Sequence, residues 1–258
     1  TAIHAPIPNA IGRCAVTRAP YEIEVDDRPR LGLIALQADE TIEDEFRYLL
    51  DPAKVRLHIS RVPSGAELTL SAIKAMETAL PAAAALLPQG AIFDAVGYAC
   101  TSGTSLIGAS KVQQLVRSGC SCKRVTNPLE AAFSALKSRN ASRLGIVSPY
   151  TDDISQNMRL DFTKAGFDVA RTRSFGEDSE AKVASISPRS IVDTVLSLTE
   201  GDDLDAVFLS CTNLRTLEAI DTLKREIDVP VLSSNLSLAW YMANSVQVEL
   251  VRYTVSEL

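Results

Sequence analysis

The chain has 258 residues, of which 46% are apolar, and 32 acidic against 26 basic side chains give it a net charge of −6. This length is enough for one large core or two smaller ones. An acidic chain without a basic cluster is a poor candidate for binding nucleic acid or an anionic membrane. We find neither a signal-peptide pattern between Thr1 and Pro20 nor a later apolar run that could span a bilayer.

The cysteine content indicates a reducing environment. The five cysteines are Cys14, Cys100, Cys120, Cys122 and Cys211. An odd number of cysteines in a chain without an export pattern is typical of free thiols, so we expect a cytoplasmic protein.

The segment 1–29 mixes proline, histidine, arginine and acids without a hydrophobic period, which predicts an extended arm that lies on the body or on a partner subunit. From Arg30 onward, short β-rich runs alternate with longer helical patterns, as in βαβ units with a mainly parallel sheet. The predicted strands are 31–36, 55–62, 93–99, 143–147, 168–172, 205–210 and 229–232.

Helix signals fill the gaps between these strands. Apolar residues recur at helical spacing from Leu70 to Leu80. Asn127 and Ser187 each precede a proline and look like N-caps, and Thr151 starts another helix. Most of the acidic run that begins at Asp39 and ends at Glu45 is expected to be the solvated start of a helix, where acids suit the helix dipole. Asp39, which is closest to the strand end, is the member that could face the cleft.

An internal repeat organises the chain into two related halves. The segment D-A-V-x-x-x-C-T occupies 94–101, where it ends in Cys100 and Thr101, and it recurs at 205–212. An R-L-G strand start at Arg30 recurs at Arg143, with nearly the same separation. Both matches occur in the same order and are separated by nearly the same number of residues. This agreement indicates that the two halves arose by duplication. We assign residues 30–126 plus 230–258 to the first half and 127–229 to the second.

The repeated Cys-Thr pairs carry the strongest chemical signal. Each cysteine falls at the carboxyl end of a predicted strand, where open parallel sheets bind their ligands. Helices predicted over 105–116 and 214–225 follow the two pairs. The backbone N–H groups of a helix start can bind a carboxylate and can lower a thiol pKa. A single cysteine at a strand end is usually a small buried apolar residue, but two at equivalent positions suggest a functional pair.

If the halves pack face to face, the thiols of Cys100 and Cys211 lie on opposite sides of one substrate. This arrangement suits removal of a proton from one face of a carbon and its return on the other, or thiolate attack with proton delivery by the second thiol. Neither reaction requires a metal or an organic cofactor. Cys120 and Cys122 lack nearby ligands for zinc, since the only histidines are His4 and His58.

At this point the sequence resembles the aspartate/glutamate racemase superfamily, in particular its maleate isomerase and arylmalonate decarboxylase branch. The stretches that carry the resemblance are L-G-L-I-A-L-Q-A-D-E-T-I-E-D-E-F, Y-A-C-T-S-G-T-S, V-S-P-Y-T-D, L-S-C-T-N-L-R-T and V-P-V-L-S-S-N. The resemblance implies two Rossmann-like parallel-sheet halves related by a pseudo-twofold axis, with the active site in the cleft between them. It also implies that Cys100 and Cys211 are the catalytic pair.

The same resemblance, together with the strand-end positions, yields a set of candidate substrate-binding residues. They are Asp39, Thr101, Ser102, Tyr150, Ser179, Thr212, Asn213 and Asn235. Asp39 and Ser179 stand where maleate isomerases have asparagines, which questions maleate as the substrate. An acid at position 39 could repel a second carboxylate or bind an ammonium or amide N–H. Cys100 argues against simple decarboxylation, because arylmalonate decarboxylases use only the second cysteine.

The L-Q-A-D-E-T variant looks most like ectoine-utilisation (EutA-type) proteins. Our leading hypothesis is a racemase or isomerase that acts next to a carboxylate, on an ectoine-pathway amino-acid derivative, in a homo-oligomer (dimer or tetramer). One alternative is a maleate-type cis–trans isomerase in which Cys100 adds to a double bond and Cys211 protonates. Another is a small-molecule binding protein without catalytic activity.

Overall fold

The computed structural model describes residues 18–253 except 68, 91 and 202. Two four-stranded parallel sheets form its centre. The first has the order β2-β1-β3-β4 and consists of β1 (Arg30–Leu36), β2 (Arg56–Val62), β3 (Phe93–Ala99) and β4 (Cys122–Thr126). The second has the equivalent order β6-β5-β7-β8 and consists of β5 (Arg143–Ser148), β6 (Asp168–Ser174), β7 (Ala206–Leu209) and β8 (Val231–Ser233). This architecture confirms the predicted fold class.

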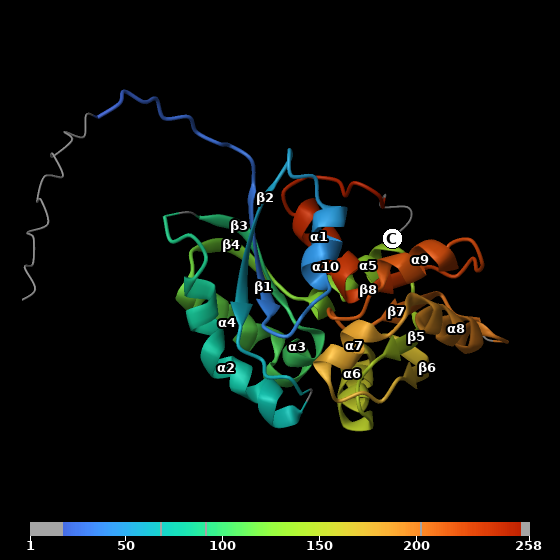
Figure 1. Cartoon of the computed structure of the whole chain (residues 1–258). Helices are drawn as coiled ribbons and strands as arrows, with labels where there is room; N and C mark the ends of the chain where they lie inside the picture. Colours follow the sequence, from blue (N-terminus) through green and yellow to red (C-terminus); the bar gives the residue numbers. More distant parts are fainter. Residues whose placement is uncertain (1–17, 68, 91, 202, 254–258) are drawn as a thin grey trace, which may run out of the picture.

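Helices pack around both sheets (Figure 1). Those that follow the strands of the first sheet are α1 (Ile42–Leu49), α2 (Leu70–Ala85), α3 (Thr101–Ile107), α4 (Ala109–Gly119) and α5 (Pro128–Ser138). Those that follow the strands of the second are α6 (Asp152–Lys164), α7 (Glu180–Ser185), α8 (Pro188–Thr199), α9 (Leu217–Leu223) and α10 (Ser234–Asn244). The caps predicted at Asn127 and Ser187 are confirmed, because each side chain accepts a hydrogen bond from a backbone N–H of the first helical turn. None of the described helices is long and apolar enough to cross a membrane.

The two repeated motifs contact each other within each half. The backbone N–H of Arg30 donates to Asp94 at 2.9 Å, and that of Arg143 donates to Asp205 at 2.7 Å. The aspartate that begins each D-A-V strand therefore holds the start of the neighbouring R-L-G strand. The glycine of the second R-L-G motif leaves room for a helix, since a Cβ atom on Gly145 would clash with the side chain of Leu198 in α8.

The structure changes several local predictions. Strand β4 is absent from the predicted strands, because its Lys123 and Arg124 are exposed at the edge of the sheet and mask the β pattern. The helix predicted over 105–116 begins too late, since α3 starts directly after Cys100 and α4 follows after Gly108. The helix predicted over 214–225 is shorter and begins at Leu217.

The proposed boundary at residue 230 does not separate the two halves cleanly, because the elements that follow it contact both sheets. Strand β8 pairs with β7 and so belongs to the second sheet, although we assigned residues from 230 onward to the first half. Helix α10, which follows β8, packs against α5 and β3 and covers the first sheet. The rest of that division stays a prediction.

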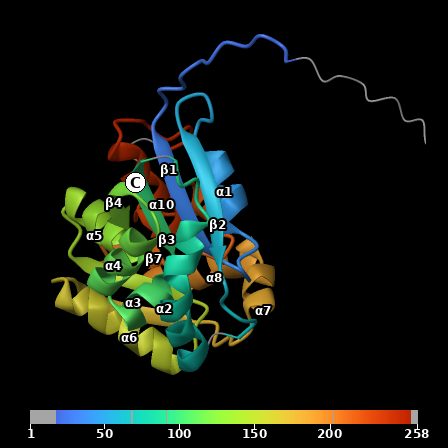
Figure 2. The same ribbon diagram turned by 90° about the vertical axis from the view of Figure 1, so that its left-hand side faces the viewer.

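The predicted arm is described only from Arg18, so Cys14 and His4 lie outside the described residues. The described part is extended, and it runs away from the body in both views (Figure 1 and Figure 2) except next to β1, where Asp26 and Arg28 contact Arg56 and Pro52. Tyr21, Ile23 and Val25 are exposed. These three residues do not lie on the body of the protein, so of the two predicted positions a partner subunit stays a prediction for them.

Candidate active site

Cys100 occupies the junction between β3 and α3. Its side chain caps the helix, because the backbone N–H of Gly103 donates to its Sγ at 3.1 Å. The turn requires glycine at position 103, where a Cβ atom would lie 2.8 Å from this sulfur. Cys100 is only 2% exposed. The sequence thus holds one thiol, buried, at the carboxyl end of a central strand.

Cys211 occupies the equivalent place after β7, but in a different conformation. Its φ of 121° lies in the left-handed region that non-glycine residues rarely adopt. Its backbone N–H donates to the hydroxyl of Ser234 at 3.1 Å. Like Cys100 it is a free thiol, and it is 5% exposed. Strain that is held in place by surrounding contacts is typical of functional positions.

Hydrogen bonds between the halves connect the two Cys-Thr segments. The hydroxyls of Thr101 and Ser234 lie 2.8 Å apart, and the hydroxyl of Thr212 donates to the carbonyl of Ala99 at 3.3 Å. Thr212 of the second half therefore contacts the first half directly, and Thr101 contacts the first residue of α10, which follows β8 of the second sheet. The site is a single unit built from both halves.

Burial and neighbouring charges set the ionisation of both thiols. Burial raises the pKa of Cys100 to about 11 and that of Cys211 well above its ordinary value. The charge of Cys100 contributes to the rise at Cys211. The helix start does contact Cys100, as predicted, but burial outweighs the lowering of its pKa that we expected. Both thiols are therefore protonated at neutral pH.

Tyr150 is buried where the charges of both cysteines act on it. Its ring is 1% exposed, its hydroxyl accepts from Ser210 at 3.4 Å, and the charges of Cys211 and Cys100 both raise its pKa, which burial raises most. A buried phenol beside two thiols can donate a hydrogen bond to a bound carboxylate.

Two buried carboxyl groups, those of Asp39 and Glu180, act electrostatically on the pKa of Cys211. Asp39 was predicted to face the cleft, and Oδ1 accepts from the backbone N–H groups of Thr41 and Ile42, while Oδ2 is buried without a partner. Glu180 is 3% exposed and accepts from the amide of Asn213 at 2.8 Å. Its charge raises the pKa of both cysteines. Sequence analysis missed Glu180, and no motif marks it.

The predicted amides bind protein groups. The amide nitrogen of Asn213 donates to Glu180, and its oxygen accepts from the backbone N–H of Glu40. The amide nitrogen of Asn235 donates to Glu45 and to the carbonyl of Thr212, both at 2.8 Å. Both residues thus position the site, while the oxygen of Asn235 is buried without a partner.

Ser102 and Ser179 differ in their proximity to the thiols. The hydroxyl of Ser102 lies 3.6 Å from the sulfur of Cys100. Ser179 is half-buried and pairs with Glu67 in an isolated β-bridge. The bridge brings the loop after β2 against the start of α7, next to Glu180. The structure thus places Ser102 at a thiol and Ser179 beside the acid that acts on the thiols.

Glu45 is a second residue that sequence analysis misplaced. We expected it in a solvated helix start, but it is buried and accepts hydrogen bonds from the second half. Within the described residues, no group of three or more His, Cys, Asp and Glu side chains is arranged to hold a metal ion. Cys120 and Cys122 are free thiols.

Comparison with known proteins gives one matching family model. The model describes arylmalonate decarboxylase and matches residues 72–258. Among curated relatives, an arylmalonate decarboxylase from Bordetella bronchiseptica is 25% identical over 139 residues, which cover 54% of this chain and 57% of that protein. A maleate isomerase from Nocardia farcinica is 24% identical over 238 residues, which cover 85% of this chain and 90% of that protein.

Two solved structures share the fold. The maleate isomerase Iso from Pseudomonas putida S16 has a TM-score of 0.77 at 20% identity, with 85% of this chain and 93% of that chain covered. A cysteine-to-serine mutant of the Nocardia farcinica maleate cis-trans isomerase, with a covalently bound succinylcysteine intermediate, has a TM-score of 0.71 at 22% identity and the same coverage.

Proposed function

The chain belongs to the arylmalonate decarboxylase family, and from this membership we propose that it is an isomerase in which Cys100 and Cys211 act on a small carboxylate without a cofactor. One observation carries the proposal. Two buried free thiols follow equivalent strands of the two halves, and the contacts of Thr101 and Thr212 join their segments into one site.

We favour thiol addition to a double bond over proton exchange, the leading hypothesis from the sequence. The maleate isomerases among the relatives and the succinylcysteine in one of them support this choice. In the proposed reaction the thiolate of Cys100 adds to the alkene carbon, and the electron pair moves to the neighbouring carbon, which takes the proton of Cys211. After rotation about the new single bond, the thiolate of Cys211 removes that proton and the C–S bond breaks. This restores the double bond and the Cys100 thiolate.

The burial of the thiols divides these roles. A protonated Cys211 is the form that donates, and burial keeps it protonated. Cys100 must lose its proton before it attacks, and its contacts with Ser102 and with the N–H of Gly103 both favour the thiolate. We assign Tyr150 to the substrate carboxylate, because it is a buried hydrogen-bond donor on which the charges of both thiols act.

Asp39 and Glu180 direct the substrate proposal away from maleate itself. Two buried carboxyls beside the thiols would repel a second carboxylate, whereas the unpartnered oxygen of Asp39 suits an N–H donor. This favours a second candidate function, racemisation at a carbon that carries both a carboxylate and a nitrogen. An ectoine-pathway amino-acid derivative, the substrate class of the EutA-type proteins that the sequence resembles, belongs to this chemical class.

Single substitutions of the two cysteines test the proposal. Cys100→Ala and Cys211→Ala should each abolish turnover, measured with maleate and with ectoine-derived amino acids. The matched control is Cys122→Ser, because Cys122 pairs with Phe93 at the opposite end of β3 and its loss should leave turnover unchanged. Retained activity without either thiol would contradict the two-cysteine mechanism. An absence of turnover in the wild type, with ligand binding that neither substitution changes, would favour a binding protein. A mass increase on Cys100 favours addition, and uptake of deuterium from deuterated water without an adduct favours racemisation.

A further inference from the structure

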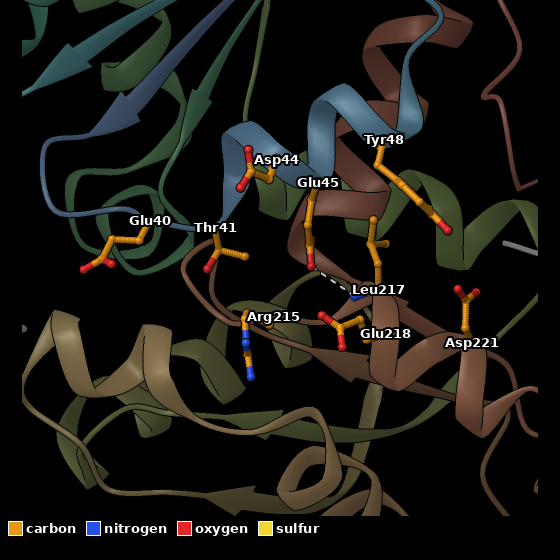
Figure 3. A pocket seen from close by; sticks show the side chains of 9 residues that line it. All are labelled: Glu40, Thr41, Asp44, Glu45, Tyr48, Arg215, Leu217, Glu218 and Asp221. Carbon is orange, nitrogen blue, oxygen red and sulfur yellow. Dashed lines mark hydrogen bonds between the residues drawn. The ribbon is translucent and has the colours of Figure 1, made fainter.

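Glu45 connects the first half to the active-site segment of the second. It lies in α1, and one carboxylate oxygen accepts from the backbone N–H groups of Thr216 at 2.7 Å and Leu217 at 3.0 Å, where α9 begins. The other oxygen accepts from the amide of Asn235 at 2.8 Å. In Figure 3 the carboxylate of Glu45 points from α1 toward the first residue of α9. Each of these contacts spans at least 171 residues of sequence.

Asn235 passes this contact on to Cys211. Its amide nitrogen has two hydrogens, and one donates to Glu45 while the other donates to the carbonyl of Thr212. The neighbouring Ser234 accepts from the backbone N–H of Cys211. The strained segment at Cys211 is therefore held at two successive points by the start of α10, and Glu45 fixes the orientation of the amide at one of them.

We propose that Glu45 is a positioning residue that holds Cys211 in its strained conformation by fixing the amide of Asn235 and the start of α9. The proposal goes beyond the assignment of the catalytic pair and rests on Cys211 being one of its members. Glu45 touches neither thiol, so its effect must pass through Asn235 and Thr212.

The surroundings of Glu45 define a matched control. Glu45 lines a cavity of about 400 Å³ between α1 and α9 (Figure 3). The same cavity is also lined by Asp44, Glu218, Asp221 and Arg215. Asp44 is exposed, belongs to the same helix and pairs with Arg47. Asp44→Asn removes the same charge as Glu45→Gln from the same helix, but it breaks no contact with the second half.

Glu45→Gln separates the two contacts of Glu45. The carbonyl oxygen of glutamine can still accept from the start of α9, but its NH₂ group then faces the NH₂ group of Asn235. Asn235 can avoid this clash of two donors by rotating its amide so that its oxygen accepts from the glutamine. That oxygen then faces the carbonyl oxygen of Thr212, and the hydrogen bond to Thr212 is lost. The substitution therefore keeps α9 capped while it breaks the contact with the Cys211 segment. Asn235→Ala breaks that contact from the other side and leaves Glu45 on α9.

The experiment measures the rate at which iodoacetamide alkylates Cys211 in the intact protein, by peptide mass spectrometry, with Cys100 as the internal reference. In Glu45→Gln and in Asn235→Ala we expect the Cys211 rate to rise relative to Cys100 by on the order of tenfold, the weight of one hydrogen bond to a charged group. The double variant should show no further rise, because both changes act through one contact. Asp44→Asn should match the wild type.

An unchanged ratio of Cys211 to Cys100 alkylation in both single variants would overturn the proposal, even if their melting temperatures fall. Additive effects in the double variant would also overturn it. The readout does not depend on the substrate, so it is independent of the proposed function. An active Cys211→Ala variant would refute the function, whereas an inactive one together with an unchanged alkylation ratio would refute only the role of Glu45.

Discussion

The hydroxyls of Thr101 and Ser234 form a 2.8 Å hydrogen bond across 133 residues of sequence. Ser234 also accepts from the backbone N–H of Cys211 at 3.1 Å, so one small side chain contacts the segments of both cysteines. Thr101 directly follows Cys100. Ser234 therefore links the two thiol segments, as does the hydrogen bond from Thr212 to the carbonyl of Ala99.

Ser234→Ala should impair this arrangement. It leaves the buried N–H of Cys211 without an acceptor, which should lower the free energy of unfolding by about 1–3 kcal/mol. Misplacement of a reacting group should also lower kcat by about tenfold or more, with a smaller change in KM. Urea unfolding and steady-state kinetics measure the two effects. Ser237→Ala is the control, because the Ser237 hydroxyl lies in the same helix, buried without a partner, so its loss should not destabilise. Equal effects of the two substitutions would contradict the role of Ser234.

Tyr150→Phe should lower activity far more than stability. The phenylalanine ring fills the same buried space, and only the hydroxyl beside the thiols is lost. If that hydroxyl stabilises charge on the substrate carboxylate, kcat should fall by about 10²-fold. Tyr253→Phe, which removes a hydroxyl bonded to Asp221 instead, should leave kcat unchanged. A Tyr150→Phe variant with normal kcat would exclude the hydroxyl from the reaction.

Glu180→Gln should make the thiols ionise at lower pH. The charge of Glu180 raises the pKa of both Cys100 and Cys211, and glutamine removes that charge while its carbonyl can still accept from Asn213. We expect the pH profile of Cys100 alkylation to move to lower pH. Glu177→Gln, which removes a charge paired with Lys182, is the control. A profile that stays in place or moves to higher pH would show that Glu180 does not act on the thiols through its charge.

Asp39→Asn should change which substrates the site accepts. The side chain keeps an oxygen for the N–H groups of Thr41 and Ile42, and the unpartnered carboxylate oxygen is replaced by an amide. We expect kcat/KM for maleate to rise relative to that for an amino-bearing carboxylate, by about tenfold, because a buried repulsive charge is removed. The ratio of the two kcat/KM values measures this change. A fall in the ratio would mean that Asp39 does not exclude a second carboxylate.

The positions of Cys100 and Cys211 at equivalent strand ends could be predicted from the sequence because the signal is local. The Cys-Thr repeat and the R-L-G repeat are short patterns, and the contact of Arg30 with Asp94 explains why they recur together. The buried acids could not be predicted in this way. Glu45 lies on a short acidic helix that looks exposed. Its burial depends on hydrogen bonds from Thr216, Leu217 and Asn235, each at least 171 residues away.

The ionisation of the thiols illustrates the same limit. A helix start after Cys100 indicates a lowered pKa, and the contact with Gly103 exists. How far burial opposes that contact depends on the packing of the second half over the first, to which Ala99 and Thr212 contribute. The repeat gives the position of each thiol along its own half. It does not show how deeply the thiols are buried once the two halves pack together.

Stability should fall as the pH rises from about 5 to 8. Burial raises the pKa of Asp39, Glu45 and Glu180, and that of Glu45 rises from 4.5 to about 7. Between these two values the folded state holds more protons than the unfolded state, so the free energy of unfolding decreases with increasing pH. For Glu45 alone the decrease amounts to about 3 kcal/mol when it is complete, above pH 7.

Urea unfolding of the wild type and of Glu45→Gln from pH 5 to pH 8 measures this contribution. His58 acts in the opposite direction, because burial lowers its pKa from 6.5. Asp94 and Asp205, with lowered pKa values, act only below pH 3.8. The difference between the two proteins removes these shared terms. The free energy of unfolding of Glu45→Gln minus that of the wild type should increase with pH between about 4.5 and 7 and then level off, because glutamine does not titrate. A difference that is constant with pH would mean that Glu45 keeps an ordinary pKa in the folded protein.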